Sequence, residues 1–426
     1  MTGRLLNSRP HKNRLYLGAG KSSAPFLFST YIWYNHCMKV LFFNYEYPPL
    51  GGGAANATEQ ILLQFSKIPD LEVDLVTSSI DADYHLGKLG ERIRIHKLPI
   101  GKNSENLHFQ SQKDLLVYSW RAYFFARKLA AENKYDLSHS FFSVPCGFLS
   151  LVFKHCNKLP YIVSLRGSDV PGYSDRFTFV YALLTPLIKL IWRNADYVVS
   201  NSQGLKDLAL RTGTKKDIAI IHNGIDTETF CPQPELRPAG SFIVTPGASR
   251  VTTRKGIKYL IEAVAELAIK YPQIALKIIG DGNEKKNLEQ LVIEKGLQKN
   301  VIFLGRVPHD KVTPFYQEAG VFVLPSLNEG MSNAMLEALA AGLPILATDT
   351  GGSKELVKDG VNGYIIKMKD SSDITTKLEK IMTDEKLRES MSRASRELAE
   401  NMSWEKVARQ YAGLYKATDI RHKTAQ

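Results

Sequence analysis

Short runs of β-branched and aromatic residues alternate with longer amphipathic segments along most of the chain. This alternation is typical of βαβ units, in which helices join the parallel strands of one sheet and cover its faces. The pattern therefore predicts an α/β fold with parallel sheets. The predicted strands span 40–44, 73–78, 93–98, 137–140, 161–165, 197–201 and 218–222 in the first half, and 242–245, 275–279, 301–304, 321–325, 345–348 and 364–366 in the second.

Helical periodicity is clearest in five segments between these strands and in one segment near the end of the chain. The five predicted helices span 54–67, 115–133, 256–270, 287–295 and 333–341. The sixth begins at Trp404 and has no strand after it. We expect it to cross back and brace the first half.

The two sets of strands are separated by a segment from Asn223 to Gly240 that contains three prolines and two glycines. Such a composition is typical of an interdomain linker. Two Rossmann-like lobes are therefore expected, with their ligand in the cleft between the strand carboxyl ends of both. The predicted parts are a first lobe over 38–222, a linker over 223–240, a second lobe over 241–403 and a C-terminal helix over 404–426.

The composition of the 426 residues excludes several classes of protein. With 44% hydrophobic and 23% charged residues, the chain is globular rather than disordered. Its four cysteines form no CxxC pair and its histidines form no cluster at metal-ligand spacing, which argues against a disulfide scaffold and a zinc site. The longest apolar run, 177–192, is interrupted by Pro186 and Lys189 and is shorter than the ~20 residues of a membrane span. We therefore expect a cytoplasmic protein.

The net charge of +12 is weighted toward the N-terminus, with +5 in residues 1–37, +5 in 38–223 and +2 in the remainder. A nucleic-acid-binding protein more often carries one dense basic stripe, so this distribution favours an anionic small ligand or a membrane surface. Residues 1–37 contain no acid and end without a small-residue cleavage site, whereas Met38 opens a strand-like run. We predict that 1–37 is a disordered basic extension upstream of a natural start at Met38.

The first predicted strand leads through Tyr45-Glu-Tyr-Pro-Pro-Leu-Gly-Gly-Gly53 into a helix. Consecutive glycines at such a turn let backbone N–H groups approach an anion, and the helix dipole adds attraction. Gly52 and Gly53 are therefore candidates for an anion site, although a flexible turn explains them equally well. The spacing does not match GxGxxG, so the dinucleotide fingerprint is absent.

The second lobe opens with the same strand–loop–helix order, and its loop carries two cations, Arg250 and Lys255, among small residues. A cation beside a helix N-terminus is electrostatically unfavourable unless an anion joins it. We therefore favour phosphate binding over the alternative, that both are solvated surface charges.

The most informative segment runs from Val321 to Pro344. Glu329 lies in a loop at a strand end, and Ser332 or Asn333 is a good N-cap for the helix that follows. Glu337 lies within that helix among Ala, Leu and Met residues, where a carboxylate is costly without a partner. No nearby basic residue supplies one, so a ligand hydroxyl is the expected partner.

Three weaker features remain. His139 lies near a strand end, where it could contact a ligand. A lone histidine is more often structural, so packing in the core is the alternative. Arg166-Gly-Ser-Asp169 ends another strand, so both charged residues are candidates to line the cleft. The stretch from Trp120 to Lys128 is aromatic and basic, as in a helix at a membrane interface, but a packed helix with a solvated basic face explains it equally well.

Together these motifs resemble the retaining family 4 glycosyltransferases of GT-B fold, and the likeness runs from Met38 nearly to the C-terminus. It implies two Rossmann-like lobes that face each other across a cleft. The motifs that carry it are the E-x7-E element from Glu329 to Glu337, Ser249-Arg250, Lys255-Gly256, Asn223-Gly-Ile-Asp226 and the Pro48-Pro49…Gly52-Gly53 loop.

The resemblance implies transfer of a hexosyl group from a UDP- or GDP-linked sugar to a hydroxyl of a glycan or lipid-linked acceptor, in polysaccharide or glycolipid synthesis. It implies retention of anomeric configuration and no metal or other cofactor. Fixed cations and a helix N-terminus suffice to stabilise a leaving diphosphate. The basic first lobe adds an expectation of peripheral association with the cytoplasmic membrane face, without any nucleic-acid partner.

The resemblance also assigns roles to residues. Arg250 and Lys255 match the positions that grip the donor diphosphate, which the Gly52-Gly53 loop faces, and Glu337 matches the ribose-binding glutamate. Glu329 matches the carboxylate that binds the donor-sugar hydroxyls, and His139 is a further catalytic candidate. Arg166 and Asp169 are assigned to the acceptor side. The backbone amides at the donor belong to Gly330, Met331, Ser332 and Asn333.

Two departures and three alternatives stay open. Many relatives show D-x-x-H-x-H where Asp136…His139-Ser-Phe141 keeps only the first histidine, and many place His where Arg166 stands, so the acceptor side is unassigned. A nucleotide-sugar epimerase on the same scaffold leaves the E-x7-E element unexplained. Intact donor residues count against a non-catalytic binding subunit. A nicotinamide dehydrogenase is the least supported, because the fingerprint is incomplete in both lobes.

Overall fold

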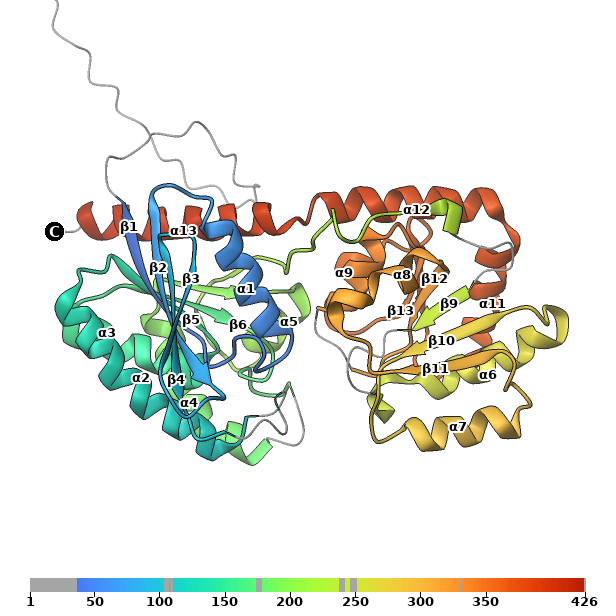
Figure 1. Ribbon diagram of the computed structural model, residues 1–426, viewed down its shortest axis with the longest axis horizontal. Helices are drawn as coiled ribbons and strands as arrows, with labels where there is room; N and C mark the ends of the chain where they lie inside the picture. The colour runs from blue at the N-terminus through green and yellow to red at the C-terminus, as the bar shows by residue number, and fades with distance from the viewer. Residues whose placement is uncertain are drawn as a thin grey trace, which may run out of the picture. The chain divides into compact units, whose positions relative to one another are not determined.

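The structure is a computed structural model that describes residues 37–102, 107, 110–173, 178–236, 242–245, 251–328 and 331–424. Within the unit Cys37–Gln426 it contains two sheets, each flanked by helices (Figure 1). Several predicted features lie outside the described residues: residues 1–36 of the extension 1–37, residues 237–240 of the linker, Arg250 with its neighbour Ser249, and the pair Glu329 and Gly330.

The first sheet has the strand order β3-β4-β2-β1-β5-β6-β7-β8. Neighbouring strands are parallel except at the edge, where β3 pairs with β4 in antiparallel register. From β1 the chain continues to β2, toward one edge of the sheet, and from β4 it crosses to β5, on the other side of β1. The loop after β1 therefore lies at a topological switch point, where ligands of open α/β sheets bind. The strands are β1 (Met38–Phe43), β2 (Leu71–Ser79), β3 (His85–Leu89), β4 (Ile93–Pro99), β5 (Leu137–Phe141), β6 (Tyr161–Leu165), β7 (Tyr197–Ser200) and β8 (Ile218–Ile220).

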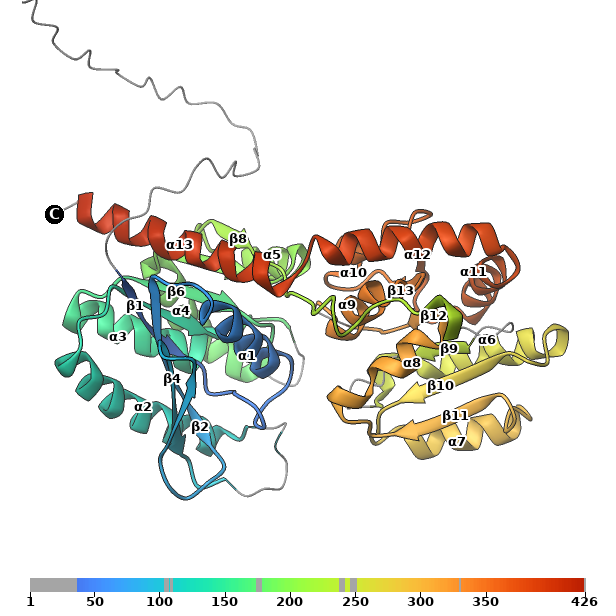
Figure 2. The same cartoon turned by 45° about the horizontal axis from the view of Figure 1, so that its top comes forward.

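The helices of the first lobe cover both faces of this sheet. Helix α1 lies on one face and α2 and α3 lie on the other, as Figure 2 shows. These helices are α1 (Gly53–Phe65), α2 (Gln112–Glu132), α3 (Phe148–Asn157), α4 (Thr178–Asn194) and α5 (Gln203–Leu210).

The second sheet has the order β11-β10-β9-β12-β13-β14, with all neighbouring strands parallel. Its switch point lies between β9 and β12, so the loops after these two strands meet at one edge. The strands are β9 (Phe242–Thr245), β10 (Ala275–Ile279), β11 (Val301–Gly305), β12 (Ala319–Leu324), β13 (Ile345–Thr348) and β14 (Gly363–Ile366).

Two separate apolar cores flank the second sheet. One contains side chains of α6, α7 and α11, and the other contains side chains of α8, α9 and α12. The helices are α6 (Ile257–Lys270), α7 (Lys285–Glu294), α8 (Thr313–Gln317), α9 (Asn333–Ala340), α10 (Ser353–Leu356), α11 (Ser371–Thr383) and α12 (Glu385–Glu400).

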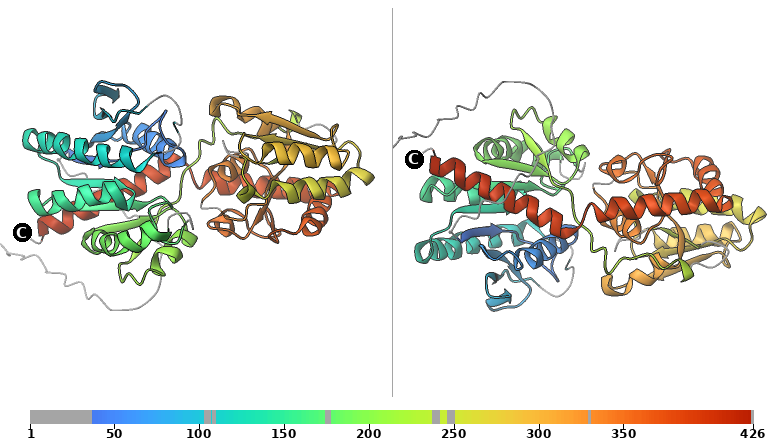
Figure 3. Two further views of the ribbon diagram at one scale, coloured as in Figure 1. Left: turned by 90° about the horizontal axis from the view of Figure 1, so that it is seen from below. Right: turned by 90° about the horizontal axis from the view of Figure 1, so that it is seen from above.

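The last helix, α13 (Trp404–Thr424), packs on the first lobe although it follows the second in sequence. Trp404, Tyr411 and Tyr415 belong to the same buried cluster as β1 and α1. Figure 1 and the right-hand view of Figure 3 show α13 running along the first-lobe elements. The first lobe is therefore completed by a segment about 200 residues distant from its own last strand.

Two details differ from or extend the sequence prediction. The edge strand β3 was not predicted, because its residues His85–Leu89 are mostly exposed and lack the apolar run of the buried strands. Residues 178–192 of the longest apolar run lie in α4. Among the described residues, no helix combines the length and apolar character needed to cross a membrane.

Candidate functional site

The loop after β9 is held against the loop after β12 by a glycine contact. Lys255 ends a short 3₁₀ turn, Thr253–Lys255, and Gly256 follows it with φ of +62°. A Cβ at Gly256 would lie 2.1 Å from the carbonyl oxygen of Pro325, so only glycine permits this approach. The N–H of Leu327 also donates to the carbonyl of Arg254 at 2.7 Å. Lys255 therefore lies beside the segment that leads toward Glu329.

Helix α9 begins directly after this segment. Ser332 is its N-cap, and the Ser332 hydroxyl accepts a hydrogen bond from the N–H of Met335 at 3.4 Å. Every residue from Ala334 to Ala340 is buried. The predicted cap is confirmed, and the first N–H groups of α9 have no intrahelical partner, as at the start of any α-helix.

Glu337 has two partners within the protein. Its Oε2 accepts a hydrogen bond of 2.8 Å from the Tyr316 hydroxyl, and its Oε1 lies 3.0 Å from Nε2 of His309. The expectation that no basic residue partners Glu337 was therefore wrong. His309 lies 28 residues upstream, in the turn before α8, and the sheet brings it to α9.

This pairing has electrostatic consequences. The hydrogen bond to the Glu337 carboxylate raises the pKa of His309 above its ordinary value. Each carboxylate oxygen can accept a second hydrogen bond, so the two partners orient the group without saturating it. A carboxylate held in this way can still accept hydrogen bonds from ligand hydroxyls.

The glycine loop of the first lobe approaches the start of α9. A Cβ at Gly53 would lie 3.3 Å from the side-chain nitrogen of Asn333. The N–H of Gly51, which has φ of +94°, donates to the carbonyl of Leu107 at 2.9 Å. The structure therefore brings Gly53 and Asn333 together, as the sequence-based assignment of both to one donor site requires.

Glu46, in the same loop, was missed by the sequence analysis. Its carboxylate accepts a hydrogen bond from the N–H of Gly52 at 3.4 Å, and burial raises its pKa to about 7. The Glu46 carboxylate occupies the Gly52 N–H that an anion could otherwise bind, and its negative charge makes the loop less attractive to anions. The available signal was an acidic residue directly between two tyrosines ahead of the glycines.

The linker connects Arg166 to α9. Nη1 of Arg166 donates to the side-chain oxygen of Asn223 at 2.9 Å, and the Asn223 amide donates to Asn333 at 3.0 Å. The guanidinium lies 3.4 Å from the ring centre of Phe141, and burial lowers its pKa. Arg166 therefore belongs to the same group of residues as Asn333.

Asp169 has a different role. Its carboxylate accepts hydrogen bonds from the backbone N–H groups of Arg166, Gly167 and Ser143, and from the Ser143 hydroxyl. The side chain is 6% exposed. Asp169 thus closes the loop after β6, and its assignment as a cleft-lining residue is corrected to one of loop support.

His139 does not reach an accessible surface. It is 0% exposed, its ring stacks on Phe42, and its two nitrogens lie 2.7 Å from the Tyr415 hydroxyl and 2.8 Å from the Ser164 hydroxyl. Burial lowers its pKa well below the ordinary value, so the ring is neutral. This corrects the expectation of a ligand contact and supports the structural alternative.

Comparisons with known proteins agree with this arrangement. The family described as Glycosyltransferase Family 4 matches residues 51–229, and the family Glycosyl transferases group 1 matches residues 235–398. An uncharacterized glycosyltransferase of Haemophilus influenzae is 32% identical over 243 residues, covering 57% of this chain and 67% of that protein. Another, of Methanocaldococcus jannaschii, is 26% identical and covers 87% and 95%.

A solved structure shares the fold. The Anabaena protein HepE, determined in complex with UDP and glucose, aligns with a TM-score of 0.68 at 20% identity over 89% of this chain and all of that one. The chain belongs to the group 1, or family 4, glycosyltransferases and has the GT-B fold. The resemblance drawn from the motifs is confirmed at this level.

Proposed function

We propose that this protein transfers a hexosyl group from a UDP- or GDP-linked sugar to a hydroxyl of a glycan or lipid-linked acceptor, with retention of anomeric configuration and without a metal. The observation that carries the proposal is the buried Glu337 carboxylate, oriented by Tyr316 and His309 and adjoining the helix start that faces the glycine loop. Such a carboxylate is suited to the two hydroxyls of a ribose.

The proposed roles follow from charge. As the sugar leaves, negative charge grows on the donor diphosphate, and fixed cations and helix N–H groups stabilise it most at that point. Lys255 and the first turn of α9 supply such groups, and we assign Arg250 to the same task. Glu329 is assigned to the donor-sugar hydroxyls. The acceptor attacks from the face of the leaving phosphate, whose oxygen takes its proton, so no dedicated base is required.

The donor class is supported by the fold relative HepE, which was solved with UDP and glucose. Calorimetric titration of the protein with UDP, GDP and NAD, without added metal, tests it. We expect UDP or GDP to bind and NAD not to bind. Loss of nucleotide binding in Glu337→Gln, with binding unchanged in Glu397→Gln, an exposed glutamate on α12, supports the assignment. Binding of NAD alone contradicts it.

Product analysis separates transfer from the alternatives. A transferase releases nucleoside diphosphate in proportion to glycosylated acceptor, whereas an epimerase converts the donor sugar without any acceptor. We expect the first result, with the anomeric configuration of the donor in the product. Conversion of donor without acceptor would refute the proposal.

A further inference from the structure

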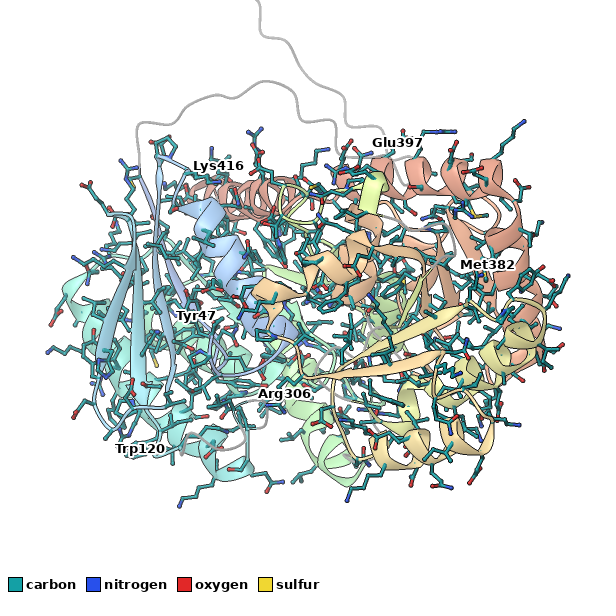
Figure 4. The ribbon with its side chains drawn as sticks, turned by 45° about the vertical axis from the view of Figure 1, so that its right-hand side comes forward. Tyr47, Trp120, Arg306, Met382, Glu397 and Lys416 are labelled. Atoms are coloured by element: carbon teal, nitrogen blue, oxygen red, sulfur yellow. The ribbon has the colours of Figure 1, made fainter. Side chains whose placement is uncertain are left out.

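Helix α2 exposes a stripe of large apolar side chains. Leu116, Trp120 and Phe124 are 72%, 69% and 47% exposed. They occur at intervals of four residues and therefore follow one side of the helix. The opposite side buries Tyr118, Ala122 and Ala126 in the first-lobe core. Trp120 lies at the edge of the molecule in Figure 4. We call Leu116, Trp120 and Phe124 the α2 stripe.

The stripe has a basic border. Lys113, Arg121, Arg127 and Lys128 are the basic residues of α2, and all four are exposed. The helix has two acids. Glu132 is its last residue, and Asp114 is held inward, where its carboxylate accepts hydrogen bonds from the Ser111 backbone and from Lys102. The described surface of this helix therefore combines apolar and aromatic groups with positive charge, which is the composition of helices that lie in the interface of an anionic membrane.

The start of α2 is tied to the glycine loop. Lys102 bonds Asp114 in the first turn of the helix at 3.2 Å, and Leu107, between them in sequence, accepts the hydrogen bond from Gly51. In a sheet of this topology the helix begins at the edge where the strands end. A surface bound along the α2 stripe is therefore close to the loop that we assign to the donor.

The geometry points to an interfacial membrane site: we infer that the α2 stripe inserts into the surface of an anionic lipid bilayer and thereby presents lipid-borne acceptors to the glycine-loop edge. The second clause rests on the proposed function; the first does not. A second copy of the chain is a poorer occupant, because a two-fold contact over the stripe would bring the basic borders of two α2 helices together.

Vesicle flotation with the full chain tests the inference. The probe is a vesicle of phosphatidylcholine with about one-third phosphatidylglycerol, compared with phosphatidylcholine alone. We expect binding only to the anionic vesicles. Trp120→Ser with Phe124→Ser should lower the partition coefficient at least about tenfold, and Arg127→Glu about fivefold or more. Ile269→Ser is the matched control, because Ile269 is 88% exposed on α6 and lies outside the stripe; it should bind like the wild type.

Tryptophan fluorescence gives a second readout. Trp192 and Trp404 are 0% and 7% exposed, so in a Trp33→Phe background Trp120 is the one exposed tryptophan of the described residues. We expect a blue shift with anionic vesicles and quenching by brominated lipid. Three outcomes would each overturn the inference: an emission spectrum unchanged by vesicles, vesicle binding of the Ser variants equal to that of the wild type, or dimerisation that depends on the stripe without vesicle binding. UDP or GDP titration of the same variants distinguishes this failure from failure of the proposed function.

Discussion

Glu337 and His139 are both polar residues in apolar elements, yet the structure gives them opposite positions. Glu337, on α9, is 8% exposed, and its partner His309 has a side chain that is 63% exposed. His139, on β5, is sealed beneath α13, with both ring nitrogens bonded to hydroxyls. The difference shows that a later segment of the chain, here α13, decides whether a polar residue within an apolar element stays close to the surface.

The largest expected effect concerns Lys255, which lies just before the start of α6. If Lys255 binds the donor diphosphate as we propose, Lys255→Ala should lower turnover by about 100-fold or more, because it removes a fixed charge that stabilises the leaving group. Steady-state kinetics with the donor identified by calorimetry measures this. Lys258→Ala, an exposed lysine in the same helix start, serves as the control. Wild-type turnover in Lys255→Ala would show that the second-lobe loop before α6 does not take part in catalysis.

Gly256 tests whether contact between the two loops maintains the site. Gly256→Ala should lower the free energy of unfolding of the second lobe by about 2 kcal/mol or more, because its Cβ meets the Pro325 carbonyl in a left-handed conformation. Gly296→Ala has a similar φ of +68° but no atom within 4 Å, so it isolates the conformational cost. Equal losses in chemical denaturation would show that the contact with Pro325 is unimportant.

On the His139 side we expect stability to change and catalysis to remain. Tyr415→Phe leaves one nitrogen of a fully buried ring without its partner and should cost about 1 kcal/mol in denaturant unfolding. Turnover at saturating substrate should stay within about twofold. A large drop in turnover with unchanged stability would return His139 to the catalytic residues and erase the contrast with Glu337.

The smallest effect is a pH dependence at His309. Its pKa is raised in the folded state, so the stabilisation from its pairing with Glu337 is complete below the unfolded pKa of about 6.5 and is lost as the pH rises through the folded value. The stability gap between wild type and His309→Gln should therefore shrink from acidic to alkaline pH. Because His309 is largely exposed, the gap should be below about 1 kcal/mol. A gap that widens with pH contradicts the pairing.

The fold was largely predictable, because periodicity and local composition report directly on strands and helices. The strands 161–165, 242–245, 275–279 and 345–348 match the observed bounds, and the remaining predicted strands differ by a few residues at one or both ends. The missed strand β3 has one neighbour, so the pairing of its exposed residues depends on β4 rather than on burial of its own side chains.

Local sequence was sufficient to predict most strands and helices and the Ser332 cap of α9, since each depends on a few adjacent residues. It was insufficient at Gly256, which was predicted to open a helix and instead forms a left-handed turn before α6. Tertiary structure alone decided that His309 and Tyr316 orient Glu337, that Asp169 closes its own loop, and that α13 covers His139. These outcomes depend on which distant segments meet. Long-range packing places a partner or a cover beside a polar group, and local sequence carries little information about either.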